Sequence, residues 1–208
     1  MGVMIQEAAG AADTTPRRHR RHGLAALGLL TVASLGLSIL GIGTGEGPLG
    51  PTGPRGSYGV SAGRDVGDDL TEGGTVLTNH GWFTVHVESI HPLPVDDAAK
   101  GLTITDVQLA PASGDLVGFL DGTGEEFVGR EVRRPTAGYS ILPHHRVDGG
   151  ASQAEVLVHA RITRPGTWTY RGYEITYRSG LARHHMVVDA ELQVCTPAGR
   201  DCSKDTAP

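Results

Sequence analysis

Apolar residues follow two different patterns along the chain, and each pattern predicts a different kind of element. In the first, residues Leu24 to Ile42 form an unbroken run without a charged side chain. About 20 apolar residues in a helix cross the roughly 30 Å hydrocarbon core of a bilayer. The basic cluster Arg17–His22 precedes the run, and such flanks stay on the cytoplasmic side. The pattern predicts one transmembrane signal-anchor helix over residues 23–43, with the N-terminus cytoplasmic and the C-terminal part extracytoplasmic.

A cleaved secretory signal is the alternative interpretation of the same segment. The apolar region of a signal peptide usually has about 7–15 residues, which is shorter than this run. The residues that follow, Ile42 to Glu46, are small and polar but lack the Ala-x-Ala form of a cleavage site. Both features favour an uncleaved anchor.

The second pattern begins at Thr75 and consists of short runs in which apolar and polar residues alternate. In the run 83–90, Phe83, Val85 and Val87 share one face, a period of two that is typical of half-buried strands. In the run 102–109 the alternation slips near Asp106, which predicts a β-bulge there. The runs that predict strands are 75–79, 83–90, 102–109, 154–162, 168–170, 173–177 and 185–194.

Gly, Pro and Asn separate these runs, as in the predicted turns Asn79–Gly81 and Pro165–Gly166. Seven or eight short strands without a soluble helix indicate an all-β fold, an antiparallel immunoglobulin-like β-sandwich. The predicted organisation is a disordered cytoplasmic tail (1–22), the anchor (23–43), a Gly/Pro-rich linker (44–73), the sandwich (74–197) and a C-terminal tail (198–208). Three Gly-Pro-x triplets in 47–56 suggest that the linker is an extended spacer that lifts the sandwich off the membrane.

Two segments carry a loose family resemblance. Leu77–Ile90 resembles the asparagine-glycine turn and Val-x-Val strand of bacterial extracytoplasmic immunoglobulin-like domains, and Pro165–Tyr177 looks like their closing hairpin. The whole layout resembles uncharacterised single-anchor membrane proteins of actinobacteria. The resemblance implies a fold and a location, and it implies no functional residues.

Charge and cysteine content narrow the function classes. Residues 44–208 contain 14 Lys and Arg against 21 Asp and Glu, so neither nucleic acid nor anionic lipid headgroups are expected as a partner of this part of the chain. The cysteines, Cys195 and Cys202, are close in sequence and lie on the predicted extracytoplasmic side, where disulfides persist. A disulfide between them is expected, because their spacing is not the Cys-x-x-Cys spacing of redox or metal sites.

Histidine pairs are the candidate metal ligands. Imidazole binds Zn and Cu(II), and the thioether of Met186 suits Cu(I). Neighbouring residues on a strand point to opposite faces, so a site requires histidines from different segments to converge. The candidates are His86, His144, His145, His184, His185 and Met186. No cofactor is expected from the sequence, with copper or zinc as the alternative and exposed histidines as the simpler interpretation.

Other chemistry has weaker support. The chain lacks the Gly-x-Ser-x-Gly, phosphate-loop and His-Glu-x-x-His motifs, so we expect it not to be an enzyme. The acidic loops 65–69 and 121–126 do not complete a calcium-binding pattern. The aromatic residues of 168–177 fit core packing better than a carbohydrate platform.

The sequence therefore predicts a membrane-tethered, non-catalytic binding or accessory module of the cell envelope. An unknown envelope protein is the expected partner, bound through the long segment 110–150, since loops longer than about 15 residues in compact domains are usually functional or disordered. Copper or zinc handling is the alternative function.

Overall fold

The structure, a computed structural model, describes the part of the chain that forms the β-sandwich. The predicted tail and anchor, residues 1–43, lie outside the described residues. Within the described residues the structure has the three-residue 3-10 helix η1 (Ala98–Lys100), and no helix there is long enough to cross a bilayer. The described residues are 47–52, 58–112, 118–122, 133–147 and 151–202.

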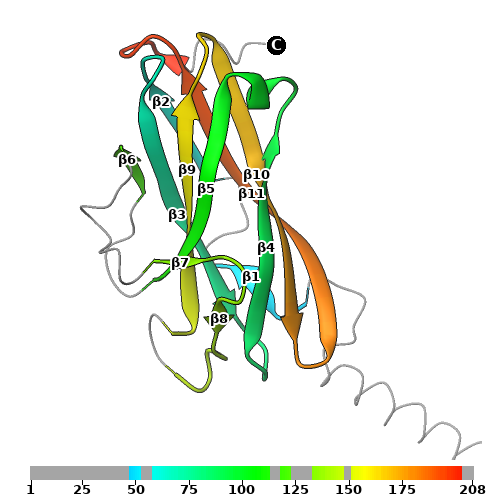
Figure 1. Cartoon of the computed structure of the whole chain (residues 1–208). Helices are drawn as coiled ribbons and strands as arrows, with labels where there is room; N and C mark the ends of the chain where they lie inside the picture. Colours follow the sequence, from blue (N-terminus) through cyan, green and yellow to red (C-terminus); the bar gives the residue numbers. More distant parts are fainter. Residues whose placement is uncertain (1–46, 53–57, 113–117, 123–132, 148–150, 203–208) are drawn as a thin grey trace, which may run out of the picture. The chain divides into compact units, whose positions relative to one another are not determined.

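Six strands form the first sheet, in the order β1-β3-β9-β5-β7 with β6 also paired to β3 (Figure 1). All its pairings are antiparallel. Its strands are β1 (Leu49–Pro51), β3 (Asp69–Asn79), β5 (Leu102–Pro111), β6 (Phe119–Asp121), β7 (Arg134–Pro135) and β9 (Gln153–Ile162).

Five strands form the second sheet, in the order β2-β11-β10-β4-β8. Strand β2 runs parallel to β11, whereas the other neighbours are antiparallel. Its strands are β2 (Tyr58–Gly63), β4 (Val85–Pro94), β8 (Ser140–Ile141), β10 (Thr167–Ser179) and β11 (Ala182–Cys195). The all-β fold with two sheets is confirmed, although the described strands number eleven rather than seven or eight.

The core lies between the two sheets and follows the alternation in the sequence. On β4, Val85 and Val87 are buried while His86 between them is exposed, as predicted, but Phe83, predicted to share their face, is exposed in the loop before β4. On β11, Met186 and Val188 are buried and Val187 is exposed. Strand β9 is buried over nearly its whole length, because it lies in the middle of the first sheet.

The predicted irregularity near Asp106 is confirmed, since the register of β5 against β9 shifts between Ile104 and Asp106. The predicted break at Arg171–Gly172 is wrong. These residues form a bulge within the single strand β10, where Gly172 has φ of +146° and the pairing with β11 shifts. The closing hairpin is instead β10–β11, which turns at Gly180–Leu181.

The predicted linker 44–73 is wrong in its described part. Leu49 is 2% exposed and pairs with Asn79, so β1 belongs to the sandwich. Proline is tolerated beside it because β1 is an edge strand. Strand β2 and the first residues of β3 also lie in this range. The described part of the Gly-Pro stretch, residues 47–52, therefore belongs to the sandwich and not to a spacer.

Candidate functional site: the loop end of the sandwich

Four segments leave the two sheets at the same end, which we call the loop end: 47–48, 80–84, 142–147 and 180–181. Strand β4 begins at Val85, which pairs with Ser179 at the end of β10 and with Ile141 at the end of β8. In the other sheet, Leu49 pairs with Asn79, the last residue of β3. These registers bring both sheet ends together at the bottom of Figure 1.

The loop end exposes apolar and aromatic side chains. Among the described residues it has four of the seven exposed large apolar side chains, including both aromatic ones: Trp82 (66% exposed), Phe83 (38%), Leu142 (36%) and Leu181 (87%). The ring of Trp82 lies 4.5 Å from that of His145, which joins the β3–β4 loop to the segment after β8. A cluster of this kind on a protein surface is typical of an interaction site.

The buried residue Asn79 connects the loop 80–84 with the segment 141–147 through hydrogen bonds. Its side chain is fully buried, and its Nδ2 donates hydrogen bonds of 2.9 Å to the carbonyls of Phe83 and Ile141. Its Oδ1 accepts a 2.9 Å bond from the Gly81 amide, an Asx turn. Its backbone carbonyl accepts from His144 N at 2.9 Å. Because Asn79 bonds both the β3–β4 loop and the end of β8, the exposed residues of 80–84 and 142–147 are attached to a fixed frame.

The loop end has a different charge from the rest of the chain. Its four described segments contain no Asp or Glu, whereas the whole protein has a formal net charge of −5. Arg146 provides an exposed cation there, and the imidazoles of His80, His144 and His145 lie nearby in sequence. Two acidic residues, Glu46 and Asp148, directly adjoin these segments in sequence, and both lie outside the described residues. The surface therefore combines exposed apolar groups with a cation.

The chain enters the sandwich at this same end, through Gly47. Gly47 has φ of +76°, and a Cβ there would clash with the Tyr177 hydroxyl and the His184 ring. The Tyr177 hydroxyl accepts a 3.3 Å hydrogen bond from the Leu49 amide. The His184 ring stacks on Tyr177 at a centroid distance of 5.1 Å, and burial lowers the His184 pKa. The entry of β1 is thus fixed by close packing.

The candidate metal ligands lie in separate places. His86 is exposed on β4 and bonds Ser140 Oγ at 3.0 Å, while His144 bonds Ser152 Oγ at 3.1 Å. His184 and His185 face opposite sides of β11, as adjacent strand residues do. His185 is exposed and lies 2.6 Å from Glu174 Oε1.

Met186 is buried in the core, and His145 packs on Trp82. Within the described part of the chain, no three His, Cys, Asp or Glu side chains are placed to share a metal ion. Copper or zinc binding stays a prediction, which a Cu(II) and Zn(II) titration of the oxidised full-length chain tests.

The core contains a carboxyl group that no pattern in the sequence predicts. Glu72 is 1% exposed, and the Tyr173 hydroxyl donates a short hydrogen bond to it from the opposite sheet. Burial raises the Glu72 pKa to about 8, opposed by the Tyr173 hydrogen bond and assisted by the nearby charge of Glu155. Glu72 is therefore mainly protonated at neutral pH. It fell within the predicted linker, so no pattern in the sequence marked it as buried.

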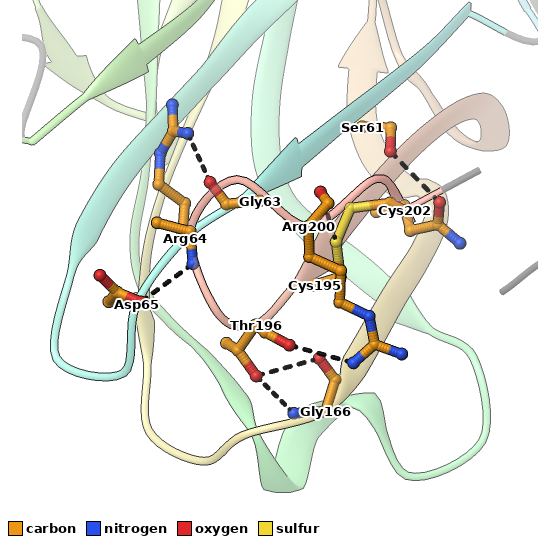
Figure 2. The surroundings of a disulfide bond; sticks show 11 residues. Ser61, Gly63, Arg64, Asp65, Gly166, Cys195, Thr196, Arg200 and Cys202 are labelled. Atoms are coloured by element: carbon orange, nitrogen blue, oxygen red, sulfur yellow. Dashed lines mark hydrogen bonds between the residues drawn. A yellow bond between two sulfur atoms is a disulfide. The ribbon is translucent and has the colours of Figure 1, made fainter. Parts of the chain in front are cut away.

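The opposite end of the sandwich, which we call the disulfide end, is closed by the predicted bond between Cys195 and Cys202 (Figure 2). The two Cα atoms are 5.7 Å apart. Thr196 Oγ1 accepts a 2.7 Å hydrogen bond from Gly166 N, and Arg200 Nη1 donates to Thr196 O at 3.0 Å. The expected disulfide is confirmed, and its loop packs against neighbouring turns.

The acidic and aromatic residues considered as other candidate sites make contacts that stabilise the fold. Asp69 forms a two-pronged ion pair with Arg161, at 2.8 and 2.7 Å, which lowers the Asp69 pKa. Tyr170, Tyr173 and Tyr177 are buried, as core packing predicts. Much of the predicted partner segment 110–150 lies outside the described residues, but its described part 142–147 belongs to the loop end.

Comparison with known proteins assigns no family. No family model and no curated protein matches the chain. Several solved structures share a general likeness. The PapD-like domain 7 of human CEP192 is 10% identical, with 74% of this chain and 87% of that chain covered and a TM-score of 0.39.

Two further solved structures show the same level of likeness. The CooA pilin subunit of enterotoxigenic Escherichia coli is 13% identical, covering 72% of this chain and 97% of that one, with a TM-score of 0.33. The VesB protease of Vibrio cholerae is 10% identical, covering 72% and 32%, with a TM-score of 0.33. Scores this low carry no argument about function, so the functional argument depends on the loop end itself.

Proposed function

We propose that this protein is a membrane-tethered, extracytoplasmic, non-catalytic binding module with an immunoglobulin-like β-sandwich, and that the loop end is its binding surface. The observation that carries the proposal is the exposed set Trp82, Phe83, Leu142 and Leu181; Asn79 fixes the loops of the first three, and Leu181 lies in the tight β10–β11 turn. Aromatic side chains on a fixed frame bind with little loss of conformational freedom.

Composition supports the loop end over the disulfide end as the binding surface. The turns at the disulfide end contain five acidic residues, Asp65, Asp68, Asp96, Asp97 and Asp201, beside four basic ones, Arg64, Lys100, Arg164 and Arg200, and no exposed aromatic side chain is described there. Interfaces are enriched in aromatic residues and arginine and depleted in Asp. The loop end fits that composition through Trp82, Phe83 and Arg146. The proposal narrows the predicted partner segment 110–150 to residues 142–147, together with 80–84 and 180–181.

Photo-crosslinking of the full-length chain in bacterial membranes tests the proposal. A benzoylphenylalanine replaces Trp82 in one variant and Val187 in the control; Val187 is 49% exposed on the outer face of β11. Adducts with protein or lipid from position 82, well above those from position 187, would support the loop end as the binding surface. Equal yields at both positions, or none at 82, would contradict it.

A further inference from the structure

We infer that the partner of the loop end is the surface of the bilayer that holds the chain, with Trp82, Phe83, Leu142 and Leu181 inserted at the headgroup level. The inference rests on the proposed function, because it names the partner of that same surface. It is argued from the length of chain between the predicted span and the sandwich, and from the chemistry of the two ends.

The first argument is the length of the tether. The predicted span ends at Gly43, and Gly47 already lies at the loop end, held against Tyr177 and His184. Four residues of extended chain reach at most about 14 Å. The headgroup layer beside the hydrocarbon core is itself roughly 5–8 Å thick. A span ending at Gly43 therefore leaves the loop end within a short distance of the lipid headgroups.

The second argument is the match between this surface and a bilayer interface. Tryptophan is enriched at the level of the headgroups, where one side of the ring is apolar and the other meets water. Trp82 is 66% exposed, and Phe83, Leu142 and Leu181 extend the apolar surface around the same end. Exposed Arg146 provides a cation for anionic headgroups, and the described loop-end segments have no acidic side chain to oppose it.

The third argument is the contrast with the far end. Trp168 and Ser179 are eleven positions apart on β10, so at about 3.3 Å per residue the two ends are separated by roughly 35 Å. The far turns contain five Asp residues against four cations, Arg64, Lys100, Arg164 and Arg200, a formal charge of −1, whereas the described loop-end segments have +1. This difference in sign, together with the four exposed apolar side chains of the loop end, favours an orientation with the disulfide end directed away from the membrane.

The tether also lowers the affinity that this contact requires. A surface linked to its partner by a few residues binds at a high effective concentration, so contacts too weak to recruit a free domain can still hold a tethered one. Four exposed apolar residues and one arginine are a small set, and they match a tethered contact.

The two tryptophans of the chain give a direct test, because one lies at each end. The full-length chain is reconstituted into phosphatidylglycerol vesicles, flotation shows that it is membrane-bound, and lipids with brominated acyl chains are introduced as quenchers. In the Trp168→Phe variant only Trp82 emits, and we expect strong quenching. In the Trp82→Phe variant only Trp168 emits, and we expect none.

A second pair of variants tests the contact without removing a tryptophan from the core. Phe83→Ser with Leu142→Ser should reduce the quenching of Trp82. The matched control, Val66→Ser with Val95→Ser, removes exposed apolar groups of the disulfide end and should leave the quenching unchanged; these valines are 50% and 36% exposed. Equal effects of the two pairs would overturn the inference.

The outcomes separate this inference from the proposed function. An unquenched Trp82 overturns membrane docking, and crosslinks from position 82 to an envelope protein would then leave the binding module standing with another partner. Equal quenching of Trp82 and Trp168 overturns the orientation and with it the inference. If the chain does not float with the vesicles, it is not membrane-bound. That result overturns both the docking and the proposed membrane location.

Discussion

The two tryptophans of this chain lie at opposite ends of one sandwich, in opposite environments. Trp168, at the disulfide end, packs its ring over Gly101, where a Cβ would collide with it, and its Nε1 donates to Arg164 O at 3.0 Å. Trp82, at the loop end, is 66% exposed and contacts the ring of His145. One indole stabilises the fold, and the other is held in solvent.

The two ends of the sandwich are also closed by different kinds of bond. The disulfide end is closed by a covalent bond, Cys195–Cys202, and its turns contain charged residues. The loop end is held by hydrogen bonds from one buried side chain, Asn79, while its apolar residues remain outside. This exposed apolar surface on a fixed frame is the feature on which the proposed binding function rests.

Loss of the Asn79 side chain is the largest expected perturbation of the loop end. Asn79→Ala removes three hydrogen bonds, to Phe83 O, Ile141 O and Gly81 N; the Ile141 bond is buried and the other two are half-buried. We expect a loss of about 3 kcal/mol in the free energy of unfolding, at about 1 kcal/mol for each bond. Denaturant unfolding followed by tryptophan fluorescence measures it.

The neighbouring exposed residue provides the control for that prediction. His80→Ala leaves the backbone bond from His80 N to Pro48 O intact and should change the stability little. Hydrogen exchange in the Asn79 variant should rise first in 80–84 and 142–147. If the two alanine variants were equally stable, Asn79 would not be what holds this end.

Removal of the disulfide should affect the opposite end by a comparable amount. The chain-entropy model for so short a loop gives about 2–3 kcal/mol. In Cys195→Ala with Cys202→Ala, we expect this loss of stability together with faster hydrogen exchange in 61–68 and 193–202. Protection at the loop end should not change, because Asn79 and its bonds are far from the disulfide. Loss of protection at both ends alike would show that they are not independent.

A pH-dependent stability is expected from the region between the two ends. The folded pKa of Glu72 is about 8 against an ordinary value of 4.5, so between these values the folded chain holds a proton that the unfolded chain has lost. This group's contribution to stability is complete below about pH 4.5 and declines as the pH rises to 8, by about 1.4 kcal/mol per pH unit.

Glu72→Gln provides the measurement for that prediction. It keeps a neutral group that can accept the hydrogen bond from Tyr173, and it should remove this slope from a series of denaturation curves. The variant should therefore gain stability over the unchanged chain as the pH approaches 8. A slope of unchanged size in the variant would assign the pH dependence to other groups.

The parts of the fold that were predicted correctly depend on local pattern. The slip at Asp106 and the inward positions Val85 and Val87 can be read within one strand, because the period of two is set by the strand itself. The bulge at Gly172 was misread as a break, since a glycine between two short runs is equally typical of a turn.

The missed features depend on residues far away in the sequence. Leu49 is buried because β1 pairs with β3, and Glu72 is buried because Tyr173, 101 residues later, faces it from the other sheet. Neither is visible in a window of ten residues. Trp82 and Phe83 beside the predicted turn Asn79–Gly81 were the available signal for the loop end, but only the registers show that 142–147 and 180–181 lie at the same end.

The smallest expected effect is a loss of local stability in mild acid at β1, where the chain enters the sandwich at the loop end. Burial lowers the folded pKa of His184 below its ordinary 6.5, so below that pH the unfolded chain takes up a proton sooner than the folded chain does. Stability from this group is complete above about pH 6.5 and is lost as the pH falls toward the folded pKa. Protonation places a charge beside Tyr177 and Gly47, where β1 begins. The protection factors of amides in 47–52, which are corrected for the intrinsic exchange rate at each pH, should therefore fall in acid, while those near Cys195 should not.

His184→Phe distinguishes this effect from general acid sensitivity. Phenylalanine keeps an aromatic ring against Tyr177 but cannot be protonated, so protection in 47–52 should no longer respond to mild acid. His91→Phe, at an exposed position on β4, is the matched control and should respond as the unchanged chain does. If protection in 47–52 fell in acid equally in both variants, another group would control the entry of β1. If protection near Cys195 fell together with it, the two ends would open as one unit, and the contrast between a covalently closed end and a hydrogen-bonded one would not extend to their dynamics.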